Sequence, residues 1–346
     1  MKLYNVTHSS DLDGMASAAL LVHYYDMPLD HVRFINYGGK IFDDCTDFIA
    51  SIKGTGNLLV VSDFGMVDNI IGKMEKALIS FKKKGNKIIW LDHHLWSKSA
   101  IERLGKVCDF MIVGENKDYC GTELVYRFLC DKDKFGDRLA KITHLADFAL
   151  ESESKEENHL IDKIAYGIKY LRSDDIANRD LLDFVSCLAK GDIDCEIINN
   201  AYNKYMKESR PYLEKLLKSA KIIEVNGVKI AVGFGTHVSH QEACMTMLKT
   251  LKTDISIHIG AEKGNSSIRS IRDPKSWGVD SVGIANAFLG GGHPLASGFS
   301  LEKSGYDLTD KTSQKEIIEK IRKVSVKLYG KKVKYFQQST GKYSMR

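Results

Sequence analysis

Residues 57–63 of this chain read NLLVVSD, and residues 87–94 read KIIWLDHH. Each stretch contains a short, continuous apolar run, which is typical of a strand buried on both faces. Between them, residues 67–84 carry apolar side chains at helical spacing and end in three lysines before Gly85, a typical helix C-terminus. A strand, a helix and a second buried strand indicate a parallel sheet with helices on its faces.

The same alternation extends the sheet towards the N-terminus. Residues 2–7 form an apolar run, residues 15–25 a helical pattern and residues 32–37 a β-rich run. We therefore expect an α/β fold, in which a parallel sheet with flanking helices forms an N-terminal domain over residues 1–205. The chain has 346 residues, which is enough for two domains.

The rest of the chain predicts a smaller, mixed α/β domain. Residues 206–220 are helical in pattern and would connect the domains, with Pro211 at the start of a separate helix. Residues 221–346 mix strands and helices, and Asn226-Gly227 between two strand-like runs is a strong hairpin signal. From Arg322 onwards, eight Lys and Arg residues and no acid predict a basic C-terminal tail.

Composition favours a cytoplasmic protein. The seven cysteines include no C-x-x-C pair, which indicates reduced thiols rather than a disulfide framework or a zinc site. The first residues already predict a strand, so we expect no signal peptide. No apolar run approaches the ~18 residues of a membrane span. The net charge of +5 is compatible with a polyanionic ligand without requiring one.

Acidic and imidazole side chains follow three of the predicted strands. The carboxyl ends of parallel strands lie at one edge of a sheet, where ligands bind in open α/β folds. Carboxylate and imidazole groups that converge there suit Mn²⁺ or Mg²⁺. The first strand is followed by His8, Asp11 and Asp13, the third by Asp63, and the fourth by Asp92, His93 and His94.

Each motif alone could be purely structural. Asp-x-Asp-Gly is frequent in turns, an aspartate at a strand end is often a helix N-cap, and a glycine run can be only a tight turn. An arginine such as Arg269 often forms an ordinary surface ion pair. The joint order and spacing of the motifs favour a metal site over these separate structural roles.

Together the motifs resemble the DHH phosphoesterase superfamily, in its branch with a C-terminal DHHA1 domain. The opening THSSDLDGMAS, residues 7–17, is most similar to NrnB-type short-oligonucleotide hydrolases, or nanoRNases. The resemblance implies a catalytic domain at 1–205 with two metal ions, usually Mn²⁺, and a DHHA1 domain at 221–346 that grips a nucleotide or oligonucleotide. It rests on Asp11-Leu12-Asp13, Asp63, Asp92-His93-His94, residues 122–126, residues 266–271 and the GGGHPLASGF run from Gly290.

The resemblance and the chemistry together give each residue a role. Two metal ions need several carboxylates, and Asp63 is our candidate bridge because it follows a central strand. Asp11 and Asp13 are expected to alternate on an extended turn and to face different ions, while Asp92 orients a histidine. The expected catalytic residues are Asp63, Asp92 and His94. The expected metal ligands are His8, Asp11, Asp13, Asp63, His93 and Asp147, with His144 as a rival ligand and Mg²⁺ or Co²⁺ as alternatives to Mn²⁺.

The second domain is expected to bind the substrate through a glycine-rich turn. The backbone amides of Gly290, Gly291 and Gly292 can hold phosphate oxygens, and the glycines let a ligand approach closely. His293 can donate to a phosphate, and Arg269 on the preceding strand can do so bidentately.

The sequence thus predicts a Mn²⁺-dependent phosphodiesterase that degrades short single-stranded RNA or DNA, including linear dinucleotides such as pGpG. A cyclic dinucleotide or adenosine 3′,5′-bisphosphate is an alternative substrate. Family-two pyrophosphatases share the first domain, but the GGGH motif argues against that activity. A catalytically silent nucleotide- or RNA-binding module is a hypothesis of another class, which the intact carboxylates disfavour because unneeded clustered charges repel. A homodimer is a further possibility that the sequence leaves open.

Overall fold

The computed structural model describes residues 1–37, 39–114, 118–148, 150, 152–173, 175–261, 264–270, 277–302, 306–337 and 342–345. The chain divides into two compact units, Met1–Tyr205 (unit 1) and Met206–Arg346 (unit 2). Each unit has its own sheet and its own apolar core. The expected α/β fold class is confirmed.

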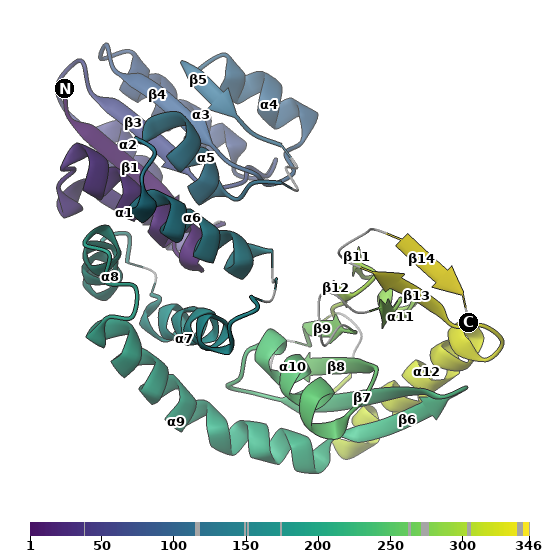
Figure 1. The fold of residues 1–346 in the computed structure, drawn as a ribbon. Coiled ribbons are helices and arrows are strands. Elements are labelled where there is room, and N and C mark those ends of the chain that lie inside the picture. The colour runs from purple at the N-terminus through teal and green to yellow at the C-terminus, as the bar shows by residue number, and fades with distance from the viewer. Residues whose placement is uncertain are drawn as a thin grey trace. The chain divides into compact units, whose positions relative to one another are not determined.

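Unit 1 is built around a five-stranded sheet in the order β2-β1-β3-β4-β5, and every pairing in it is parallel (Figure 1). The central strand β3 therefore lies between β1 and β4. All five strands point the same way, so the residues that follow them lie at one edge of the sheet. The strands are β1 (Leu3–His8), β2 (Val32–Ile35), β3 (Leu58–Ser62), β4 (Lys87–Leu91) and β5 (Phe110–Ile112).

Helices cover both faces of this sheet, as its continuous apolar strands require. Successive residues of a strand face opposite sides of the sheet and belong to different apolar cores. Val60 and Leu91 therefore pack with one set of helices, whereas Val61 and Trp90 pack with the other. The first set is α1 (Leu12–Tyr25), α5 (Gly121–Leu129), α6 (Lys134–Asp147), α7 (Lys155–Leu171) and α8 (Arg179–Ala189). The second set is α2 (Gly39–Ser51), α3 (Ile71–Lys82) and α4 (Lys98–Gly105), and the 3-10 turn η1 (Leu29–His31) precedes β2.

Helix α1 begins earlier than expected. The sequence predicted an extended turn up to Gly14, but the helix starts at Leu12, so Asp13 lies in its first turn and Asp11 at its N-cap. A carboxylate in the first turn is favoured by the helix dipole, which explains the earlier start. Gly14 is required there, because a Cβ atom would lie 2.0 Å from the carbonyl oxygen of His8.

A single helix, α9 (Glu196–Ser219), replaces the two helices expected on either side of residue 206. Pro211 was predicted to begin a helix but lies inside one. Proline in a helix interior removes one hydrogen bond. Buried side chains on both sides, such as Tyr205 and Leu213, offset that cost by packing.

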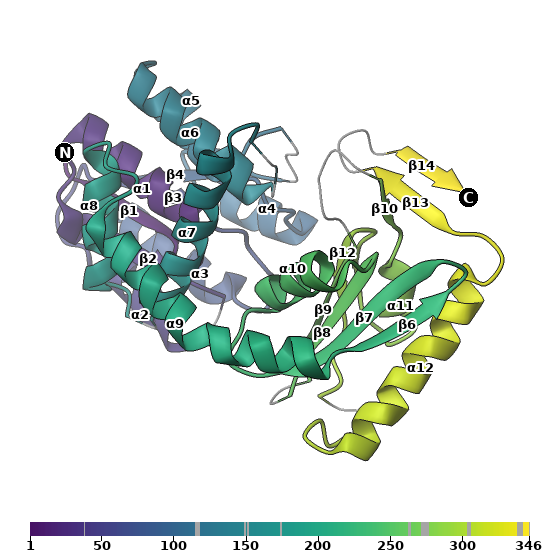
Figure 2. The ribbon, with the colours of Figure 1, turned by 60° about the horizontal axis from the view of Figure 1, so that its bottom comes forward.

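Unit 2 contains a six-stranded mixed sheet in the order β11-β12-β9-β8-β7-β6 (Figure 2). Strands β6 (Lys221–Val225) and β7 (Val228–Gly235) form the expected hairpin, in which Asn226 and Gly227 both have positive φ. The other strands of this sheet are β8 (Ile255–Gly260), β9 (Ser266–Arg269), β11 (Gly291–His293) and β12 (Ala296–Gly298), and the helices of the unit are α10 (His240–Leu251), α11 (Val282–Asn286) and α12 (Lys311–Tyr329).

The C-terminal segment is part of the fold and not a loose basic tail. Helix α12 buries Ile317, Ile321 and Tyr329 in the core of unit 2. The next strand, β13 (Lys334–Gln337), pairs with β10 (Trp277–Val279) and with β14 (Lys342–Met345). The prediction of a tail counted the charges there and treated the aromatic residues between them as accessible, whereas Tyr329 and Phe336 are buried. No helix in the described ranges is long and apolar enough to cross a bilayer.

Candidate active site

The structure brings all six expected metal ligands together at the carboxyl edge of the unit 1 sheet. In three groups the donor atoms of the members lie within 4.8 Å of one another. Asp63 and His93 each belong to two of these groups, and of the two only the carboxylate has a second oxygen with which to serve two ions. The groups are His8 with Asp11 and Asp63, Asp13 with His93 and Asp147, and Asp63 with His93 and His94.

The nitrogen Nε2 of His93 lies among three carboxylates. It is 3.8 Å from Asp13 Oδ2, 3.7 Å from Asp63 Oδ1 and 3.6 Å from Asp147 Oδ2. These distances are too long for hydrogen bonds. They suit ligands of one cation, because two donors each about 2.1 Å from a metal lie roughly 3–4 Å apart.

Asp63 combines burial, backbone strain and an unsatisfied oxygen. Its side chain is buried and its φ is +49°, a conformation that residues other than glycine seldom adopt. Burial, and then the charges of Asp13 and Asp11, raise its pKa well above the ordinary value of an aspartate. A bound cation would offset both causes.

Three buried atoms of this cluster have no hydrogen-bond partner among the described residues: Asp11 Oδ1, Asp63 Oδ2 and His93 Nε2. Buried polar atoms are normally satisfied, so such a cluster indicates a ligand that is not part of the polypeptide. Burial and then the charge of Asp13 also raise the pKa of Asp147 to about 8. The donor set therefore fits divalent cations.

Asp13 is fixed by the N-terminus of α5, which the sequence did not reveal. Its two carboxylate oxygens accept hydrogen bonds from the amides of Gly121 and Thr122, at 2.7 and 2.6 Å. The first turn of a helix is a natural anion site. Gly121 has no room for a side chain, since a Cβ atom would lie 2.7 Å from Asp63 Cβ. Gly121 precedes the motif-like run at residues 122–126, which was the available signal.

Asp92 holds the loop that follows β4. It is fully buried, and its carboxylate bonds to His94 Nδ1 at 2.7 Å and accepts from Trp96 Nε1 at 2.7 Å. Burial lowers the pKa of His94, but the hydrogen bond to Asp92 and the charges of Asp92, Asp147 and Asp13 together raise it more, so the net shift is upward. With Nδ1 engaged, His94 has Nε2 left for other partners, and its side chain is 40% exposed.

The end of β2 adds two residues that the sequence analysis missed. Asn36 accepts a hydrogen bond from Ser10 and donates one to Ser9, which holds the loop before α1. The Tyr37 ring stacks on Phe64 at 4.8 Å. Burial and then the charge of Asp92 raise the pKa of Tyr37 to about 12. Tyr37 OH and His94 Cβ both lie against Gly65, within 3.0 Å of where its Cβ atom would be.

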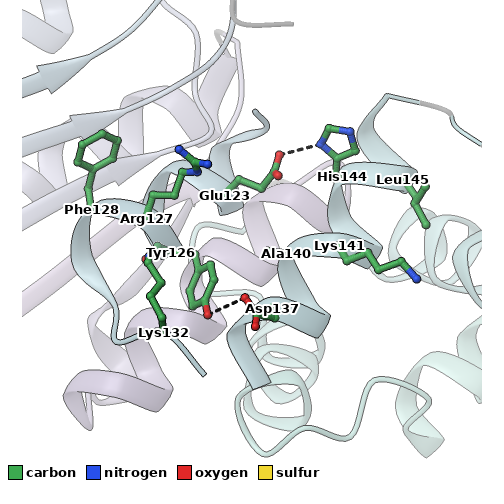
Figure 3. A pocket seen from close by; sticks show the side chains of 10 residues that line it. All are labelled: Glu123, Tyr126, Arg127, Phe128, Lys132, Asp137, Ala140, Lys141, His144 and Leu145. Carbon is green, nitrogen blue, oxygen red and sulfur yellow. Dashed lines mark hydrogen bonds and ion pairs between the residues drawn. The ribbon is translucent and has the colours of Figure 1, made fainter. Parts of the chain in front are cut away.

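His144 does not join any of the candidate metal groups. Its Nδ1 is bonded instead to Glu123 Oε2 at 2.8 Å, and Glu123 also accepts from the backbone of Cys120. This pair links α5 to α6 and lines a pocket of about 670 Å³ between the two helices (Figure 3).

In unit 2, Arg269 and His293 lie in one row of the sheet. Ala296 on β12 is the cross-strand partner of both, Arg269 on one side and His293 on the other. Arg269 donates to Ser267 and to the Ile268 carbonyl, and no described carboxylate lies within ion-pair distance of it. Burial lowers its pKa below the ordinary value of an arginine. A largely buried arginine with this environment suits an anionic ligand.

The glycine-rich segment is an edge strand and not the turn expected from the sequence. Gly291 to His293 form β11, and the chain reverses at Pro294 and Leu295. Two of its glycines are required by packing, since a Cβ atom on Gly290 would lie 2.1 Å from the Gly298 oxygen, and one on Gly292 2.7 Å from Ser297 Cα. Only Gly291 has open space around it.

Residues 2–152 match the model of the DHH family, N-terminal domain. The match contains every candidate metal ligand, and together with the donor cluster it supports a metal-dependent phosphoesterase. It ends before unit 2, so the DHHA1 assignment and the NrnB subtype stay predictions.

Two solved structures of low sequence identity share this fold. RecJ from Thermus thermophilus, in complex with Mn²⁺, has a TM-score of 0.53 at 12% identity over 94% of this chain and 52% of its own. An exopolyphosphatase-related protein from Bacteroides fragilis has a TM-score of 0.50 at 16% identity, over 93% of this chain and 92% of its own. A pGpG-specific phosphodiesterase, PggH, from Vibrio cholerae has a TM-score of 0.49 at 14% identity, over 92% and 99%. No curated protein sequence matches the chain.

Proposed function

We propose that this protein is a Mn²⁺-dependent phosphodiesterase that hydrolyses short single-stranded oligonucleotides, including linear dinucleotides such as pGpG, to mononucleotides. The observation that carries the proposal is the group of three buried atoms, Asp11 Oδ1, Asp63 Oδ2 and His93 Nε2, that have no hydrogen-bond partner among the described residues. Such a cluster costs folding free energy unless cations occupy it.

In this proposal His8 and Asp11 would hold one ion, Asp13, His93 and Asp147 would hold the other, and Asp63 would be available to both. When bound, such a pair lowers the pKa of water and offsets charge on the phosphate. The backbone amides of Gly121 and Thr122 keep Asp13 oriented. Asp92 orients His94, whose Nε2 would hydrogen-bond a phosphate oxygen.

The second unit would hold the part of the substrate that does not react. Arg269 and His293, which share Ala296 as their cross-strand partner, offer a guanidinium and an imidazole to phosphate oxygens. The Leu295 amide donates to His293 Nδ1, which leaves Nε2 as the donor in the neutral tautomer. Binding energy from such remote contacts can be used to orient the reacting phosphate.

A substrate panel tests the proposal. The protein is incubated with Mn²⁺ and, separately, with 2- to 10-nucleotide strands, cyclic dinucleotides and adenosine 3′,5′-bisphosphate, and products are resolved by chromatography. We expect mononucleotides from the short linear strands and no turnover after chelation. Turnover of only the bisphosphate or the cyclic compounds would replace the proposed substrate. Tight nucleotide binding without turnover of any compound would indicate a silent binding module.

A further inference from the structure

The pocket between α5 and α6 is lined by acidic residues whose carboxylates are already engaged (Figure 3). Glu123 accepts hydrogen bonds from His144 and from the Cys120 amide. Asp137 accepts one from the hydroxyl of Tyr126 at 3.0 Å. Among the described residues, neither carboxylate forms an ion pair with a lysine or arginine of the pocket.

Three cations line the same pocket, and two of them lie on aromatic rings. The guanidinium of Arg127 is 3.9 Å from the centre of the Tyr119 ring, and the ammonium of Lys132 is 4.1 Å from that of Tyr126. Lys141 has only Glu157, at 3.4 Å, as an ion-pair partner among the described residues. No described carboxylate forms an ion pair with Arg127. The residues that line the pocket carry three positive and two negative formal charges.

An exposed aromatic pair adjoins these cations. Phe128 is 50% exposed and Phe110 is 42% exposed, and their ring centres are 5.8 Å apart. Phe128 also lines the pocket. Basic groups interleaved with accessible aromatic rings are the features with which proteins bind single-stranded nucleic acids, because cations contact phosphates and rings stack on bases.

The pocket and the metal centre share the helices α5 and α6. Helix α5 begins at Gly121, whose amide binds Asp13, and α6 ends at Asp147. The Glu123–His144 pair lies between that end of the helices and the cations. A strand with a phosphate at the metal centre could thus extend along α5 within unit 1.

We propose that the α5–α6 pocket binds the continuing part of a single-stranded oligonucleotide, with Arg127 and Lys132 at its phosphates and Phe128 at a base. The volume of about 670 Å³ is within the usual range of ligand sites. The inference rests on the proposed function for the class of its ligand, but it concerns binding and not hydrolysis.

Binding of a fluorescein-labelled pentanucleotide to the full-length protein in EDTA, followed by anisotropy, tests the inference separately from catalysis. We expect Arg127→Glu to weaken binding about 10-fold and to reduce the slope of log affinity against log salt by about 0.7, the value for one phosphate contact on a single strand. Phe128→Ala should weaken binding at least ~5-fold with an unchanged slope, because stacking releases no counterions. Arg179→Glu is the matched control, since it makes the same charge change at a side chain that is 79% exposed on α8.

The inference is overturned if the wild-type protein does not bind the pentanucleotide, or if Arg127→Glu behaves like Arg179→Glu. It is also overturned if Phe128→Ala converts a dimer into a monomer on size-exclusion chromatography, because the aromatic face would then be a self-interface. Pentanucleotide binding without hydrolysis in Mn²⁺ would leave this site intact and sink the proposed function. Hydrolysis of the pentanucleotide in Mn²⁺, with no effect of Arg127→Glu on binding, would overturn this site and leave the proposed function intact.

Discussion

At the scale of single residues, Asp63 combines several energetically unfavourable features. Its left-handed backbone, buried carboxylate and unsatisfied oxygen are each unfavourable in the metal-free protein. The raised pKa means that stability present at low pH is lost as the pH rises through that pKa, because the fold disfavours the ionised form. Strain of this kind persists where a bound ligand offsets it.

Replacing Asp63 by asparagine should therefore separate folding from metal binding. We expect activity to fall at least ~100-fold, since even loss of a group that only supports a ligand costs about 10–100-fold. At neutral pH the metal-free variant should melt no lower than metal-free wild type, because a charge that the fold disfavours is gone. Metal analysis, calorimetry and turnover measure the three effects. Full activity in a folded Asp63→Asn protein would contradict the two-ion site.

Tyr37 provides a second test, on the open side of the same cluster. Its hydroxyl lies against Gly65 beside His94, where it could donate to a phosphate oxygen. Tyr37→Phe keeps the ring on Phe64 and removes only the hydroxyl, so we expect kcat/KM to fall about 10-fold, as for one hydrogen bond to a charged group. Bound Mn²⁺ and the melting temperature should stay the same. Tyr25→Phe, which removes a hydroxyl bonded to the Leu129 carbonyl, is the control. Equal losses in both variants would exclude a role for Tyr37.

At the scale of elements, the edge strand β11 allows two neighbouring glycines to be compared. Gly291→Ala adds a methyl group into open space, so the fold should be retained while KM for an oligonucleotide rises several-fold if this strand faces the substrate. Gly290→Ala places a Cβ atom 2.1 Å from a carbonyl oxygen, and overpacking of this kind typically costs about 1–3 kcal/mol. Thermal melts and steady-state kinetics distinguish the two. An unchanged KM in Gly291→Ala would remove β11 from the substrate site.

Some helices and strands could be predicted from the sequence, and others could not. The buried strands at 58–62 and 87–91 were predictable, because a short, continuous apolar run flanked by polar and turn residues is typical of a buried strand. The start of α1, the unbroken α9 around Pro211 and the strand character of β11 were not. Each depends on contacts with residues distant in sequence, which local propensity does not reflect.

The same distinction holds for the candidate site. Its carboxylates and imidazoles were predictable because they follow consecutive strands of one parallel sheet. Gly121 and Tyr37 were not, since a glycine at a helix start and a tyrosine after an edge strand are both common in positions without function. Their importance depends on contacts across the sheet edge, with Asp63 for Gly121 and with Phe64 for Tyr37.

At the scale of the whole molecule, the proposed roles fall on separate compact units. Unit 1 contains the metal ligands and the α5–α6 pocket, and unit 2 contains Arg269 and His293. The substrate contacts that we propose are few in each unit. Substrate length is therefore the property that tests the molecule as a whole.

We expect kcat/KM to rise from two to about five nucleotides and then to level off. The first added nucleotides would gain contacts with the α5–α6 cations, and such remote contacts increase the rate by orienting the reacting phosphate. Further nucleotides would meet no additional site that we propose. Bis-p-nitrophenyl phosphate should react slowly, because it offers only a scissile phosphate. Single-turnover and steady-state rates on a 2- to 20-nucleotide series measure the trend. Rates that climb steadily to 20 nucleotides would instead indicate a processive exonuclease with a longer binding path than these residues provide.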